Sequence, residues 1–124
     1  PDSRYHDFLR AGEAQLIADF ACAGWLILGA QAPESWRSTD LAVHKVSAWI
    51  DGKKVTDGIG SNVLGDPRIA LAWIANELSQ EGMGLKADDI VSTGTCITPV
   101  SVSVGQHFVA DFGTLGKVGV RLTD

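Results

Sequence analysis

The sequence predicts one α+β domain, spanning residues 1–124, in which two helices pack on a mostly antiparallel, twisted β-sheet or roll. Two segments have the spacing of amphipathic helices, a hairpin signal lies between them, and the C-terminal part alternates apolar and polar residues. A chain of 124 residues suits a single domain, and 45% hydrophobic with 20% charged residues is typical of a globular protein.

The first helix is expected over residues 11–24. Leu16, Phe20 and Ala23 recur there at helical spacing, and a glycine follows that can end the helix. Residues 25–29, with the sequence WLILG, are predicted to form a short, fully apolar strand. A polar loop that contains a proline comes next, so the strand is expected to end there.

Residues 44–55 carry the clearest hairpin signal. Every second residue from 46 to 50 is apolar, as in a strand with one buried face. Asp51 and Gly52 follow, and this pair favours the positive backbone angles of a two-residue turn. Two antiparallel strands joined by a tight turn are therefore predicted.

The second helix is predicted over residues 65–82. Asp66 can cap it and Pro67 fits its first turn. Its main apolar face is formed by Leu71, Ile74, Ala75 and Leu78. Ile69 and Trp73 widen the apolar surface, so this helix is expected to be covered on more than one side.

Three strands are predicted after this helix, over residues 88–94, 106–112 and 117–123. The second alternates with Phe108, Ala110 and Phe112 on one face, and the third with Val118, Val120 and Leu122. Glycines separate the segments, as expected for turns between strands.

Composition argues against several classes of function. The net charge is −5 with a pI near 5.0, and no basic stripe is present to neutralise phosphates, which argues against nucleic acid as a partner. The longest apolar run, residues 25–30, is too short to span a bilayer, and no signal peptide is visible. Two well-separated cysteines, Cys22 and Cys96, favour a reducing compartment, so a cytoplasmic protein with no membrane partner is expected.

No motif identifies a catalytic residue or a metal site within the chain. His6, His44 and His107 lie far apart and share no ligand spacing. The neighbouring aspartates at 88–89 fit a solvated turn better than a cation site. A nucleophile elbow and a phosphate-binding glycine loop are both missing, so the catalytic residues are left unassigned and no metal ligand is predicted.

The segment STGTCITPVSV, residues 92–102, is the best candidate for a binding site. Thr93, Gly94 and Thr95 follow an apolar run, and a glycine at a strand end lets a ligand approach the backbone. The two hydroxyls and nearby amides could hold a carboxylate. Alternatively, both threonines satisfy the hydrogen bonds of a turn.

Four segments together resemble the C-terminal half of the 2-keto-4-pentenoate hydratase group, which belongs to the fumarylacetoacetate hydrolase superfamily and includes 4-oxalocrotonate decarboxylases. They are DSRYHDF, IADFACAGWLILG, VLGDPRIALAWIANEL and DIVSTGTCITPVSVSVGQHF, at residues 2–8, 17–29, 63–78 and 89–108. The resemblance covers nearly the whole chain. It implies a fumarylacetoacetate hydrolase-like C-terminal domain, the catalytic region of a longer hydratase.

The resemblance implies a lyase of aromatic-compound degradation that acts on a small 2-oxo or 2-hydroxydienoic acid. Such enzymes hydrate a 2-hydroxy-2,4-dienoate to a 4-hydroxy-2-oxo acid, or, in the decarboxylase branch, release CO₂. They use Mg²⁺ or Mn²⁺, because a hard divalent cation polarises the 2-oxygen of the substrate. Thr98, near the candidate turn, is neutral, which favours a monocarboxylate such as 2-hydroxypenta-2,4-dienoate.

The resemblance also assigns residues. Thr93, Gly94 and Thr95 match the substrate-side turn and would hold the substrate carboxylate. Ser3 and Arg4 match a stretch that braces the metal-bearing strand, although Arg4 equally fits a surface ion pair.

Two features depart from the family pattern. Phe20 and Cys22 fall where many members carry Asn and Ser, so part of the polar lining is missing and Cys22 is expected only in a supporting position. The metal-binding carboxylates and the catalytic lysine of the family precede Asp2. The chain is therefore expected to bind no metal alone and to need either a missing N-terminal half or the subunits of a homo-oligomer.

Two other functions stay open. A non-catalytic binding or assembly module would keep the fold and lack the metal site. A hydrolase of the same superfamily, cleaving a carbon–carbon bond of an acylpyruvate, is less favoured, because such chemistry usually needs a histidine base and neither His6 nor His107 is well placed.

Overall fold

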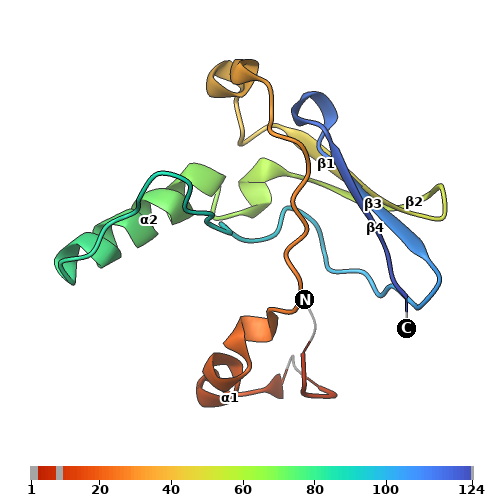
Figure 1. Ribbon diagram of the computed structural model, residues 1–124, viewed down its shortest axis with the longest axis horizontal. Helices are drawn as coiled ribbons and strands as arrows, with labels where there is room; N and C mark the ends of the chain where they lie inside the picture. The colour runs from red at the N-terminus through yellow and green to blue at the C-terminus, as the bar shows by residue number, and fades with distance from the viewer. Residues whose placement is uncertain (1–2, 8–9, 124) are drawn as a thin grey trace.

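A computed structural model describes residues 3–7 and 10–123. It shows an α+β arrangement around a four-stranded antiparallel sheet in the order β2-β1-β3-β4, which confirms the predicted fold class (Figure 1). The strands are β1 (Lys45–Ile50), β2 (Lys53–Ile59), β3 (His107–Asp111) and β4 (Lys117–Arg121). The α-helices are α1 (Glu13–Ala18) and α2 (Pro67–Gln80), and the short 3₁₀ turns are η2 (Phe20–Cys22), η3 (Glu34–Ser38), η4 (Gly60–Asn62) and η5 (Gly113–Leu115).

The hairpin between β1 and β2 forms where the sequence predicts it. Asp51 and Gly52 have φ values of 49° and 80°, as a two-residue turn of this kind requires. The turn is also tied to the next strand of the sheet, because the His107 amide donates to Asp51 Oδ1 and the Asp51 amide donates to the His107 carbonyl, each over 2.9 Å. Both central strands are thus held in register at this end.

The small core lies on one face of the sheet. Val46 and Ala48 of β1 are buried, and Ala110 of β3 stands opposite Ala48. Val118 of β4 pairs in turn with Ala110, while the intervening residues of β4 are exposed. The predicted alternation is confirmed in β4 and at Val46 and Ala48 of β1. In β3 all five residues are half-buried, and Phe112, predicted on the same face as Ala110, lies beyond the strand and is exposed.

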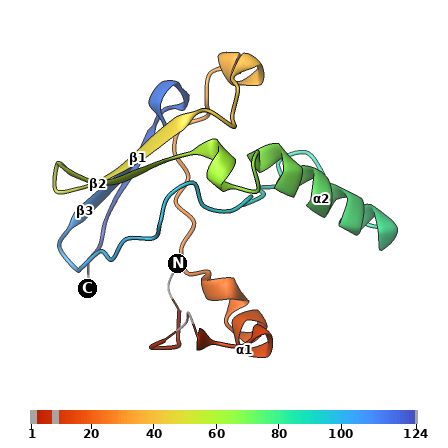
Figure 2. The ribbon, with the colours of Figure 1, turned by 180° about the vertical axis from the view of Figure 1, so that it is seen from behind.

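Helix α2 forms with the predicted cap, but the prediction that it is covered on more than one side is wrong for the described chain, because none of its residues is buried. The Asp66 carboxylate accepts a 2.8 Å bond from the Arg68 amide, which is the expected N-terminal cap, and Gly82 adopts φ of 71° just beyond the helix. Figures 1 and 2 show that α2 projects sideways from the sheet, and Trp73 is 60% exposed. None of the helices in the described part of the chain is both long and apolar enough to cross a membrane.

Two predicted strands do not form. Residues 25–29 and most of 88–94 have no regular secondary structure. No hydrogen bond between described residues involves residues 24–32 or 90–94. A strand exists only when a neighbour accepts and donates its backbone hydrogen bonds, and the described part of the chain offers neither segment such a neighbour.

The first helix is shorter than predicted. It ends at Ala18, and the chain then turns through Phe20, Ala21 and Cys22, whose φ values are 49°, 52° and 63°. Each left-handed non-glycine residue costs roughly 1–2 kcal/mol, so a run of this kind must be held by its surroundings. The residue that precedes it, Asp19, is buried.

Gly58, near the end of β2, and Gly60, the first residue of η4, let other segments touch the backbone here. A Cβ on Gly58 would lie 2.0 Å from the Cys96 carbonyl oxygen, and one on Gly60 would lie 1.8 Å from the Leu41 carbonyl oxygen. No larger residue fits at either position without moving the neighbouring backbone. The segment that contains the candidate site is thereby packed directly on β2.

Replacing Gly58 with alanine is expected to destabilise the protein by about 2 kcal/mol or more, because the added methyl group overlaps the backbone at Cys96. Gly84→Ala is the matched control, since a Cβ there meets nothing within 4 Å. It should change the free energy of unfolding by less than about 0.5 kcal/mol. Urea denaturation measures both, and equal stability of the two variants would show that the close approach is absent.

Candidate functional site

The segment that carries the candidate turn is fixed at the end of β2. The Asn62 side-chain amide, in η4, donates a 2.8 Å hydrogen bond to the Cys96 carbonyl. The same carbonyl lies against Gly58, as described above. Burial raises the pKa of the Cys96 thiol, so this cysteine is protonated at neutral pH and is a poor nucleophile.

Gly94 needs to be a glycine for two reasons. Its φ is 126°, a backbone conformation that other residues rarely adopt. A Cβ there would also lie 3.1 Å from Val63 Cγ1, and Val63 is buried. The turn therefore brings a bare stretch of backbone against an apolar side chain.

The two threonines differ in their hydrogen bonds. Thr95 Oγ1 donates to the Ile97 carbonyl over 2.6 Å and accepts from the Ile97 amide over 3.3 Å, so its hydroxyl satisfies a local turn. Thr93 is half-buried, and its hydroxyl has no hydrogen-bond partner among the described residues. Of the two, Thr93 is the one that has a hydroxyl available for a ligand.

Ser3 and Arg4 meet at the Asp19 carboxylate. Ser3 Oγ donates to Asp19 Oδ2 and Arg4 Nη1 donates to Asp19 Oδ1, each over 2.7 Å, and the Arg4 amide adds longer bonds of 3.3 Å to both oxygens. Asp19 is only 2% exposed, whereas the Arg4 side chain is 68% exposed. Arg4 thus forms an ion pair, but its partner is a buried carboxylate, and the pair joins residues 3–7 to the end of α1.

Asp19 was not singled out from the sequence. The sequence did contain a signal: Asp19 stands three residues after Leu16, at a position where the predicted helix should have an apolar side chain. A buried aspartate needs donors, and the serine and arginine of the DSR stretch supply them. Asp2 and Phe8, which flank Ser3–Asp7 in the quoted segment, lie outside the described residues.

The Arg4 guanidinium, and after it the Ser3 hydroxyl, hold the pKa of the Asp19 carboxyl below its ordinary value, while burial acts in the opposite direction. Asp19 is therefore ionised at neutral pH. The lowered pKa means that the ionised form stabilises the folded state above about pH 4, the unfolded value, and that this contribution is lost as the pH falls toward the folded value.

Cys22 closes the left-handed turn that follows Asp19. Its amide donates a 3.0 Å bond to the Asp19 carbonyl, and the residue is 7% exposed. The structure thus groups Ser3, Arg4 and Cys22 around Asp19, and it places Gly94 of the candidate turn against Val63. No hydrogen bond or ion pair between described residues joins Ser3, Asp19 or Cys22 to Thr93–Thr95.

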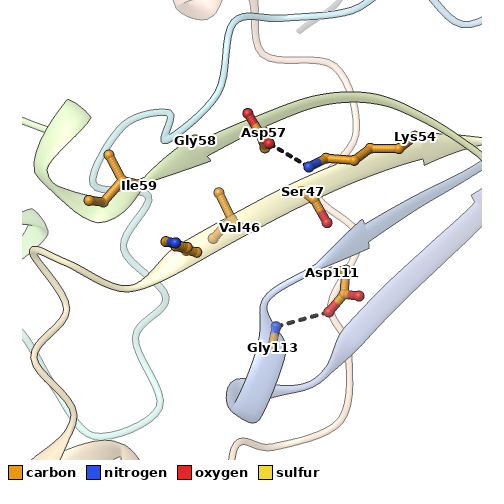
Figure 3. A pocket seen from close by; sticks show the side chains of 9 residues that line it. Val46, Ser47, Lys54, Asp57, Gly58, Ile59, Asp111 and Gly113 are labelled. Atoms are coloured by element: carbon orange, nitrogen blue, oxygen red, sulfur yellow. Dashed lines mark hydrogen bonds and ion pairs between the residues drawn. The ribbon is translucent and has the colours of Figure 1, made fainter.

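A shallow depression of about 490 Å³ lies elsewhere, on the sheet (Figure 3). Its carboxylates are already neutralised: Asp57 forms an ion pair with Lys54, and Asp111 lies 2.8 Å from Lys117 Nζ. Each lysine holds the pKa of its partner carboxyl below the usual value. None of the sequence-predicted site residues lines this depression, so we assign it no role.

Within residues 3–7 and 10–123, no three His, Cys, Asp or Glu side chains gather in a way that could hold a metal ion. The Asp19 carboxylate, which lies beside the predicted supporting residues, already accepts hydrogen bonds on both oxygens from Ser3 and Arg4. The described residues therefore do not fit a complete metal centre by themselves.

We expect Asp19→Asn to lower the melting temperature at pH 7, because a neutral amide binds the Arg4 guanidinium less strongly and cannot accept bonds on both atoms. The wild-type chain should lose more stability than the variant between pH 5 and pH 3, since protonation removes the same charge. Glu81→Gln, an exposed side chain just after α2, is the control and should follow the wild-type profile. Parallel pH profiles for Asp19→Asn and wild type would contradict this role.

Comparison with known proteins places these features in a family. The model of the fumarylacetoacetate (FAA) hydrolase C-terminal domain matches residues 4–123. The chain is 29% identical over 123 residues to a 2-hydroxyhexa-2,4-dienoate hydratase of Comamonas testosteroni, covering 99% of this chain and 46% of that protein. It is 32% identical over 108 residues to a 2-keto-4-pentenoate hydratase of Burkholderia vietnamiensis, covering 87% of this chain and 41% of that protein.

Solved structures agree with the sequence comparison. The 4-oxalocrotonate decarboxylase from Pseudomonas putida G7, complexed with magnesium and adipate, superposes with a TM-score of 0.84 at 30% identity, covering 98% of this chain and 45% of the decarboxylase. The chain thus spans less than half the length of the relatives it matches. It shares their fold over nearly all of its own length, and it belongs to the fumarylacetoacetate hydrolase family, in which it corresponds to the C-terminal domain.

Proposed function

We propose that the chain is the substrate-side part of a hydratase-type lyase. In this reaction water adds to a 2-hydroxy-2,4-dienoate and gives a 4-hydroxy-2-oxo acid. The observation that carries the proposal is the match to a dienoate hydratase over 99% of the chain, together with a shared fold over 98% of it in the related decarboxylase. The whole match, rather than any single motif, supports the reaction class.

Within this proposal the Thr93–Thr95 turn binds the substrate carboxylate. The Thr93 hydroxyl is available as a donor, and the neighbouring Gly94 is exposed, although the side on which its Cβ would stand is filled by Val63. Thr95 acts indirectly, by holding the turn through its two bonds to Ile97. Fixing the carboxylate orients the conjugated chain of the substrate for the addition of water.

Ser3, Arg4 and Asp19 have a positioning role in the proposal. They join residues 3–7 to α1 and to the left-handed turn. Mg²⁺ or Mn²⁺, which would polarise the 2-oxygen of the substrate, would be held by carboxylates outside these 124 residues. The related decarboxylase was solved with magnesium and, in a second structure, with calcium, which supports a divalent cation in the complete protein.

Decarboxylation of a 2-oxo acid is the second candidate. It is favoured by the 30% identity and the TM-score of 0.84 with the 4-oxalocrotonate decarboxylase. The two reactions differ in their products, because decarboxylation releases CO₂ and hydration consumes water without releasing a fragment. A non-catalytic module is the third candidate, supported by the lack of a three-ligand metal cluster among the described residues.

The protein encoded by the complete reading frame that contains these residues should hydrate 2-hydroxypenta-2,4-dienoate when Mg²⁺ or Mn²⁺ is present. A chelator should abolish the activity and added metal should restore it. The loss of dienoate absorbance together with product mass measures the reaction. Release of CO₂ from 4-oxalocrotonate would favour the decarboxylase, and inactivity on both substrates with metal bound would contradict the lyase proposal.

Thr93→Val and Thr95→Val should separate ligand binding from turn formation. Thr93→Val removes a free hydroxyl, so stability should change by less than about 0.5 kcal/mol while KM of the complete enzyme rises about tenfold. Thr95→Val breaks two local bonds and should cost about 1 kcal/mol of stability. Urea denaturation and steady-state kinetics check both, and an unchanged KM for Thr93→Val would remove Thr93 from the site.

A further inference from the structure

The sequence of residues 25–29 is typical of a β-strand, but in the structure this segment pairs with no strand of the described chain. The sequence WLILG predicts a strand buried on both sides. In the structure this segment runs beside the sheet as an irregular connection between η2 and η3 (Figures 1 and 2). Its backbone makes no hydrogen bond to any described residue.

The side chains of this segment are equally uncovered. Trp25 is 91% exposed, Leu26 64%, Ile27 42% and Leu28 62%. At the end of the segment, a Cβ on Gly29 would lie 3.3 Å from Val118 Cβ of the sheet. Four consecutive large apolar side chains on the surface, next to unsatisfied backbone groups, form a typical site for the addition of another strand.

The free backbone and the exposed side chains together restrict what can cover the segment. A helix would cover apolar side chains but would leave the amides and carbonyls of residues 25–29 without partners, which is costly once water is excluded. A strand satisfies the backbone, and its neighbours cover the side chains on both faces. Residues 90–94, also predicted as a strand and also unpaired, present a second site of the same kind, with Ile90 59% exposed.

The relatives indicate where such a strand comes from. More than half of the length of each relative lies outside the match, and this chain keeps the fold of the decarboxylase over 98% of its length. The segment is therefore part of a backbone arrangement that the relatives have as one part of a longer chain. A second copy of this chain would also offer its own unpaired residues 25–29, and the concentration dependence of the chain alone distinguishes that partner from the rest of a longer protein.

We propose that residues 25–29 are a strand-docking site that pairs, through backbone hydrogen bonds, with the polypeptide portion that the relatives contain beyond the match. This inference depends on the proposed function only in assuming that a complete protein contains such a portion. Its test does not use turnover, so it can fail or succeed separately from the lyase reaction.

Hydrogen–deuterium exchange on the protein from the complete reading frame tests the docking site. The amides of residues 25–29 should exchange on the order of 100-fold more slowly than those of an unpaired chain, and the paired amides of β1 serve as the internal reference for slow exchange. Exchange as fast as in an exposed loop would overturn the proposal. Slow exchange that appears in the 124-residue chain alone, and only as its concentration rises, would identify a second copy as the partner and would also overturn it.

Proline and alanine variants in the complete protein distinguish backbone pairing from apolar cover alone. Adjacent amides of a strand point to opposite edges, so at least one of Leu26→Pro and Ile27→Pro should remove a pairing bond and cut the protection about tenfold or more. Leu26→Ala and Ile27→Ala keep the amides and should retain most of the protection. If both prolines behave like the matching alanines, while Trp25→Ala causes the largest loss, the segment is covered through its side chains and strand pairing is wrong. A circular dichroism spectrum of each variant confirms that the sheet has formed.

Discussion

The close approach of two segments to the backbone of β2 fixes the position of much of the molecule. Gly58 and Gly60 have no side chain in the way, so the Cys96 and Leu41 carbonyls lie directly against this end of the sheet. The contact at Gly58, reinforced by the bond from Asn62 to Cys96, holds the Thr93–Thr95 turn at one place on the sheet. Because the chain between β2 and β3 is otherwise long and only lightly packed, the geometry of the turn depends on this contact.

A second constraint acts at the other end of the chain. Asp19 is a buried charge whose donors come from residues 3 and 4, and it immediately precedes a run of left-handed residues. Removing one partner of a buried, hydrogen-bonded charge pair destabilises the folded state by more than the pair's net contribution to stability. The reason is that the remaining partner is left buried without a hydrogen bond. We infer that this cluster maintains the strained turn at Phe20–Cys22, as well as the position of the segment that contains Ser3 and Arg4.

Sequence reasoning succeeded where local signals are sufficient. The Asp51–Gly52 turn and the Asp66 cap each depend on a few neighbouring residues, and both formed as expected. It failed where a strand depends on a distant partner: residues 25–29 and 88–94 have strand composition, but no strand of the described chain pairs with them. None of residues 20–22 is a glycine, so the left-handed turn was not predicted. The polar residue at position 19 of the helical pattern was visible, but its donors, Ser3 and Arg4, could not be placed beside it from sequence. The assignment of Thr93, Gly94 and Thr95 to the substrate stays a prediction.

The central claim is that these residues form one part of a metal-dependent lyase. Native mass spectrometry and metal analysis, made on the same sample purified from the complete reading frame, test it most directly. The account predicts a polypeptide longer than 124 residues, or a tightly bound second polypeptide, with a stoichiometric divalent metal ion. A stable, metal-free species of the 124-residue chain alone, produced by the complete reading frame, would contradict it and leave a non-catalytic module as the better description.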